Sequence, residues 1–114
     1  MIVITRTFRK YLSDFSHRTL DEIFSLLRKH SRGLDTNLFE IEKYETYIIL
    51  KWYLDGKRVR LLVAKHGQAY IPLSLYKKES KEGFNIRSGF HAIPLIQKVE
   101  KDIQNDEFET FSLE

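Results

Sequence analysis

The stretch GKRVRLLVAKHGQAYIPLSLYKK, from Gly56 to Lys78, decides the fold, because it reads as two strands joined by a tight turn. Apolar and polar residues alternate on both sides of His66-Gly67-Gln68, the pattern of an antiparallel hairpin. Asp55-Gly56 is a second turn signal, and it separates this hairpin from another apolar run. The centre of the chain therefore predicts a β-meander with strands at about 37–43, 46–53, 58–65 and 69–76.

Helical spacing flanks the meander. Apolar residues repeat every three or four positions in 8–15 and again in 20–27, with a break near Ser16, so two helices ending near Ser31 are predicted. Pro94 and the apolar residues after it predict a last helix, and Ile2-Val3-Ile4 fits a first strand. The predicted fold is α+β: two N-terminal helices packed on one face of a small, mostly antiparallel sheet, with a short C-terminal helix.

Length and composition limit the classes of protein to consider. A chain of 114 residues matches one domain, expected over 1–105, and the acidic residues 106–114 are expected to form a tail. The absence of cysteine excludes disulfides, thiolate metal sites and a cysteine nucleophile. No signal peptide and no apolar run of about 20 residues is present, so we expect a cytoplasmic protein with no membrane partner.

Charge is distributed unevenly along the chain. Residues 51–81 carry eight Lys or Arg and two acidic residues, whereas residues 99–114 carry six acidic residues and one Lys. The middle is therefore basic and the end acidic. One hypothesis is that the acidic tail covers the basic patch of its own chain.

Turn lengths predict a strand register. A two-residue turn at Asp55-Gly56 would pair Tyr53 with Arg58 and Lys51 with Arg60, and a three-residue second turn would pair Arg58 with Tyr76. The face predicted to be apolar holds Ile48, Leu50, Trp52, Val59, Leu61, Val63, Ile71, Leu73 and Leu75. The opposite face is predicted to hold Lys51, Tyr53, Arg58, Arg60, Ser74, Tyr76 and Lys78. Pro72 lacks a backbone donor, so it indicates an edge position or a bulge in the last strand.

The predicted polar face favours an anionic partner. A face rich in Lys and Arg is often only solvated. Here, however, the cations come from three strands, lie between tyrosines and have almost no carboxylate to neutralise them, although like charges across strands repel. Phosphates bound by Arg and Lys, with bases stacked on tyrosines, would suit single-stranded RNA.

The segment 56–78 resembles the end of the sheet in the RelE/ParE superfamily of bacterial toxin-antitoxin toxins, specifically its RelE-like mRNA interferase branch. The likeness extends over nearly the whole chain: first strand, helical pair, antiparallel sheet, basic exit from the last strand, and C-terminal helix. It implies a RelE-like fold and a metal-independent endoribonuclease, a hydrolase-type toxin that inhibits translation by cutting mRNA on the ribosome. It also implies a cognate antitoxin as partner and no small-molecule cofactor.

The resemblance also implies roles for particular residues. Arg58 would contact the scissile phosphate, Lys78 would close the last strand as a basic site residue, and Lys51 would activate the attacking 2′-hydroxyl. Phe84 stands where several members carry a catalytic tyrosine, and it can stack on a base but cannot move a proton. The residues expected to bind RNA are Arg60, Tyr53, Tyr76, Lys77 and Phe84.

Two other functions remain open. ParE-like members of the superfamily inhibit DNA gyrase without cleaving anything, and a member with Phe84 in place of the tyrosine could be an inactive module that binds nucleic acid or protein. The four histidines show no spacing typical of a metal site, so no metal is assigned.

Overall fold

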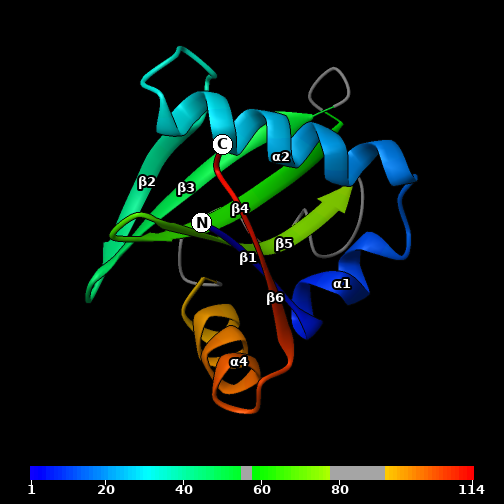
Figure 1. The fold of residues 1–114 in the computed structure, drawn as a ribbon, viewed down its shortest axis with the longest axis vertical. Coiled ribbons are helices and arrows are strands. Elements are labelled where there is room, and N and C mark those ends of the chain that lie inside the picture. Colours follow the sequence, from blue (N-terminus) through cyan, green and yellow to red (C-terminus); the bar gives the residue numbers. More distant parts are fainter. Residues whose placement is uncertain (55–57, 78–91) are drawn as a thin grey trace.

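The computed structural model describes residues 1–54, 58–77 and 92–114, which form an α+β structure (Figure 1). This part of the chain contains three helices and a mostly antiparallel six-stranded sheet, with strand order β2-β3-β4-β5-β1-β6. The elements, in chain order, are β1 (Ile2–Thr5), α1 (Arg6–Leu12), α2 (His17–Ser31), β2 (Phe39–Tyr44), β3 (Tyr47–Leu54), β4 (Val59–His66), β5 (Ala69–Lys77), α4 (Ala92–Gln104) and β6 (Phe108–Phe111).

The sheet lies between α2 and α4, so both of its faces carry a core (Figure 1). The core on the α2 side includes Ile23, Leu26 and Leu27 of the helix together with Leu50, Leu54, Val59, Leu61, Val63 and Leu75 of the sheet. The core on the α4 side includes Ala92, Leu95, Ile96 and Val99 of the helix together with Ile49, Leu62, Ala64, Ile71 and Leu73 of the sheet. The face predicted to be polar is therefore half covered by α4.

Helix α1 takes a different place from the one expected for the first of two helices on one face. Thr5 caps it by accepting a hydrogen bond from the Phe8 backbone N–H, and the Phe8 side chain is fully buried. The main contacts of α1 are with β5, β1 and α4 rather than with α2. It consequently stands at one end of the sheet, next to the C-terminal helix.

The turn between β4 and β5 has two residues, so the predicted three-residue loop is wrong. His66 pairs with Ala69, and Gly67 has a positive φ of 57°, which glycine adopts without strain in a hairpin turn. Further along the hairpin the register shifts by one residue: Val63 pairs with Pro72, but the next residue of β4, Leu62, pairs with Ser74. The bulge that Pro72 indicated is thus present.

This bulge changes which face some β5 residues occupy. Ile71 and Leu73 were predicted on the α2 side with Leu75, but they pack on the α4 side, and only Leu75 packs as predicted. The extra residue restores the alternation further along the strand. Tyr76 therefore lies on the predicted face, the α4 side, but opposite Arg60 rather than Arg58.

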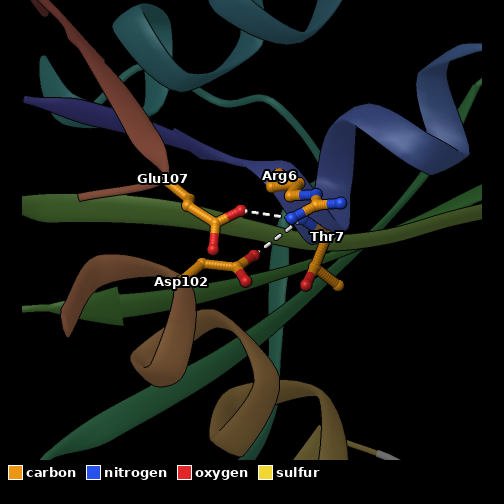
Figure 2. A network of polar contacts seen from close by, with 4 residues as sticks. All are labelled: Arg6, Thr7, Asp102 and Glu107. Atoms are coloured by element: carbon orange, nitrogen blue, oxygen red, sulfur yellow. Dashed lines mark hydrogen bonds and ion pairs between the residues drawn. The ribbon is translucent and has the colours of Figure 1, made fainter. Parts of the chain in front are cut away.

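The acidic end of the chain is built into the sheet rather than forming a tail. Residues Phe108–Phe111 form the edge strand β6, antiparallel to β1, and the Phe111 ring centroid lies 4.8 Å from that of Phe24 on α2. The residues before β6 close a polar network on the start of α1 (Figure 2). In it, Arg6 Nη1 lies 2.6 Å from Glu107 Oε2, and the Thr7 N–H donates to Asp102 Oδ2 at 2.7 Å.

The carboxylates of this segment are therefore engaged away from the basic face of β3 and β4. Glu107 pairs with Arg6, and Glu109 pairs with Arg9. The hypothesis that the acidic end covers the basic patch is wrong for these two residues.

No helix in the described ranges is both long and apolar enough to span a membrane.

A partly buried histidine makes stability depend on pH. His30 Nδ1 lies 2.7 Å from the Tyr70 hydroxyl, and burial together with the nearby Lys65 charge lowers the pKa of His30 below its ordinary value of 6.5. The folded state disfavours the protonated His30 ring, so protonation favours unfolding. The contribution of neutral His30 to the free energy of unfolding is therefore fully present above pH 6.5 and is lost as the pH falls toward the folded-state pKa. We expect the free energy of unfolding of the wild type to decrease over this range.

Urea unfolding at several pH values checks this expectation. His30→Gln removes the titrating ring and should show a flatter dependence on pH than the wild type. His17→Gln, at an exposed position, is the matched control and should keep the wild-type slope. Equal slopes for His30→Gln and the wild type would contradict the assignment.

Candidate nucleic-acid interface

Three side chains form a row across the open end of the α4 side of the sheet. Tyr53 of β3 pairs with Arg60 of β4, and Arg60 pairs with Tyr76 of β5. Residues directly opposite each other in antiparallel strands project from the same face, with Cβ atoms about 5 Å apart. We call Tyr53, Arg60 and Tyr76 the tyrosine–arginine row. Lys51 lies on the same face of β3, beside the row.

The register differs by two residues from the predicted one. Tyr53 lies opposite Arg60 rather than Arg58, and Lys51 lies opposite Leu62 rather than Arg60. A shift of two preserves the faces, so Lys51, Tyr53, Arg60 and Tyr76 stay on one face, but the centre of the group moves. Arg60 occupies the middle of the row, whereas Arg58 precedes β4 and is exposed.

The cations of this face rest on an aromatic ring instead of on carboxylates. The Arg60 guanidinium carbon lies 5.4 Å from the centroid of the Tyr53 ring, and Lys51 Nζ lies 5.5 Å from it. Both distances are typical of cation–π contacts. Within the described part of the chain, ion pairs join Arg6 to Glu107, Arg9 to Glu109 and Lys43 to Glu40. Lys51, Arg58 and Arg60 enter none of these three ion pairs.

Arg60 is the most constrained of these cations. Its side chain is partly buried, and its Nε–H is buried without an acceptor among the described residues. Buried donors in proteins nearly always have a partner. The Nε–H itself is closed to solvent, so a phosphate from outside would meet the terminal N–H groups of the guanidinium.

Tyr76 is placed in the row, but its ring is only 3% exposed, so it cannot stack on a base as the sequence suggested. Burial raises the pKa of its hydroxyl, while the neighbouring Arg60 charge opposes that rise. The hydroxyl is buried and forms no hydrogen bond of acceptable geometry in the described part of the chain, even with Arg60. Tyr76 therefore lies opposite Arg60 as a buried neighbour whose hydroxyl has no hydrogen-bond partner among the described residues.

Phe39 belongs to this face, and sequence reasoning missed it. It pairs with Lys51 across β2 and β3, its side chain is 43% exposed, and its ring centroid lies 6.2 Å from that of Tyr53. Aromatic residues of this exposure are the ones that can stack on bases. The signal in the sequence was weak, because Phe39 and Ile41 alternate with glutamates and read as a buried stripe.

Of the remaining predicted site residues, the structure describes Lys77. Lys77 ends β5 opposite Val59, and it is exposed. Lys78 and Phe84 fall outside the described residues. Helix α4 packs on the same face of the sheet, over Leu62 and Ala64.

Chemically, the site offers fixed cations and an aromatic surface. No group of three or more His, Asp or Glu side chains that could hold a metal ion occurs among residues 1–54, 58–77 and 92–114.

A scan of the sequence against protein-family models finds no match. A search of curated proteins finds no similar sequence either.

Proposed function

We propose that this chain is an RNA-binding ribonuclease that acts on mRNA as the toxin of a toxin-antitoxin pair. The observation that carries the proposal is the tyrosine–arginine row, which presents Arg60 and Lys51 on the face of Tyr53 with no carboxylate partner among the described residues. Phosphates are bound by such cations, and single-stranded bases stack on exposed rings such as Phe39. RNA meets both requirements.

The order of elements gives further support. A first strand, two helices, four antiparallel meander strands and a later helix are the elements that the resemblance to RelE-like toxins implies, and this chain adds strand β6 after them. We infer a RelE-like fold on this basis. As in that family, the partner would be a small antitoxin, and the place of action would be the cytoplasm, where messages are translated.

RNA carries its own nucleophile, so the protein needs only to move protons and to stabilise charge. The 2′-oxygen bonds to phosphorus while a base takes its proton, and the bond from phosphorus to the 5′-oxygen breaks while an acid protonates that oxygen. The products are a 2′,3′-cyclic phosphate and a free 5′-hydroxyl. Fixed cations lower the barrier by stabilising the extra negative charge of the transition state.

The residues of the row and its neighbours divide these tasks. Arg60 binds the scissile phosphate in our proposal, replacing Arg58, because it lies in the middle of the row with its guanidinium over the Tyr53 ring. Lys51 is the candidate to activate the 2′-hydroxyl. Tyr53 keeps its ring under both cations, and Phe39 provides the stacking surface.

An assay of mRNA on translating ribosomes tests the proposal. The purified protein should cut the message and leave 2′,3′-cyclic phosphate ends. The exposed variant Arg18→Ala, on α2 at the opposite face, should cut as the wild type does. Intact message together with inhibited DNA supercoiling by gyrase would favour the ParE-like activity, and inactivity in both assays would favour a binding module.

A further inference from the structure

A groove lies beside the tyrosine–arginine row, between α1, the end of β5 and α4. Its volume of about 740 Å³ falls in the range of pockets that bind ligands of substantial size. The groove is lined by Thr7, Lys10, Tyr11, Asp14, Phe15, Leu75, Tyr76, Lys77, Lys98, Lys101 and Asp102. Segments far apart in the sequence therefore meet there. Of the lysines that line the groove, Lys77 alone belonged to the site predicted from the sequence.

Lysines dominate the charge of the groove. One comes from α1, one from β5 and two from α4, whereas the carboxylates are Asp14 and Asp102. Asp102 already accepts a hydrogen bond from the Thr7 N–H at 2.7 Å and points to the start of α1 (Figure 2). Its charge is thus offset by the positive end of that helix, and the groove keeps an excess of positive charge.

The groove and the row share one residue, Tyr76. This residue lies opposite Arg60 on one side, and on the other it lines the groove with Leu75 and Lys77. Tyr11 and Phe15, which are partly buried, add aromatic surface to the wall. A chain that leaves Arg60 across the end of β5 would enter a channel with cations on its rim and rings in its wall.

We propose that this groove binds the sugar-phosphate backbone of the RNA segment adjoining the nucleotide held at Arg60. The proposal rests on the proposed function, because it takes single-stranded RNA as the ligand. Lysines on three separate elements match a chain of phosphates better than a single anion, since their charges surround the groove instead of converging on one point. Lys98 and Lys101 are exposed and adjacent on α4, so they form the outer rim.

RNA length provides the test. Fluorescence anisotropy compares the binding of labelled 2′-O-methyl RNAs of 4 and 12 nucleotides, which cannot be cleaved. The wild type should bind the longer RNA more tightly. The double variant Lys98→Gln, Lys101→Gln should lose about 10-fold in affinity for the 12-mer only, and its salt dependence should weaken by about 0.7 in logarithmic slope for each lost phosphate contact.

Controls separate the groove from general electrostatics and from the proposed function. Arg18→Gln with Lys29→Gln removes the same charge from exposed positions of α2, on the opposite side of the sheet, and should leave both affinities unchanged. Equal loss in both double variants, or equal loss for both RNA lengths, would overturn the groove assignment. Cleavage of message without any gain from RNA length would overturn it while leaving the proposed function intact. Absence of all RNA binding by the wild type would overturn both.

A polyglutamate peptide distinguishes the other class of anionic partner. The wild type should bind this peptide much more weakly than the 12-mer RNA, because the rings in the groove wall gain nothing from carboxylates. Peptide binding as tight as RNA binding, and sensitive to Lys98→Gln with Lys101→Gln, would overturn the RNA assignment in favour of an acidic protein segment.

Discussion

Replacing Arg60 by alanine is expected to lower the rate of RNA cleavage by about 100-fold or more, whereas Arg58→Ala should lower it only a few-fold. Arg60 lies between Tyr53 and Tyr76 on a central strand, and its Nε–H is buried without an acceptor in the described residues. A charge held in this way needs little reorganisation when a phosphate arrives. Arg58 is exposed and lies outside the strand, so its contact with RNA would be screened by solvent.

Single-turnover cleavage of ribosome-bound message measures both variants. Arg60→Lys should recover only part of the lost rate, since a lysine keeps the charge but loses the fork of donors. Circular dichroism and urea unfolding should show that all three variants remain folded. A larger loss for Arg58→Ala than for Arg60→Ala would contradict our assignment and return the phosphate to the residue that the family resemblance implies.

Removing the Tyr76 hydroxyl is expected to stabilise the protein. This hydroxyl is buried without a hydrogen bond to the described residues, so the folded state bears its desolvation cost. Tyr76→Phe keeps the ring and should raise the free energy of unfolding by about 1 kcal/mol. A group that costs stability is retained for function in many sites, so we also expect slower RNA cleavage in this variant.

The same substitution at Tyr70 is the matched control and should have the opposite sign. Tyr70 is as buried as Tyr76, at 1% exposed, but its hydroxyl forms a hydrogen bond with His30 at 2.7 Å. Tyr70→Phe leaves that partner unsatisfied and should lower the free energy of unfolding by about 1–2 kcal/mol. Urea unfolding at pH 7.5 measures both changes. A loss of stability in Tyr76→Phe would mean that its hydroxyl is paired after all.

Much of the secondary structure was predictable, because it follows from local patterns. The four meander strands, the helix that ends at Ser31 and the C-terminal helix lie within a few residues of the predicted ranges. Strand β6 was missed because FETF is short and lies among acidic residues. Its strand conformation depends on pairing with β1 and on the contact of Phe111 with Phe24, both of which are distant in the sequence.

The candidate site was predictable as a set of residues but not as an arrangement. Lys51, Tyr53, Arg60 and Tyr76 were expected on one face, and they lie on one face. Their pairing was predicted incorrectly. A two-residue second turn was rejected because it would place Ile71, Leu73 and Leu75 on the face of the cations, and the bulge that returns Leu75 to the other face was not included. Tyr76 was expected to be exposed, and it is buried. Phe39 was not expected, because an edge position cannot be recognised without knowing the strand order.

The sequence by itself determined which residues alternate along each strand, because successive side chains of an extended chain point to opposite faces. That rule is local and survives a register shift of two residues, which is why the polar set stayed together. Only the tertiary structure decided which arginine stands between the tyrosines, where α4 closes the sheet, and how lysines from three elements surround one groove. Each of these depends on the total burial gained by strands and helices that pack together, and no short stretch of the chain contains that information.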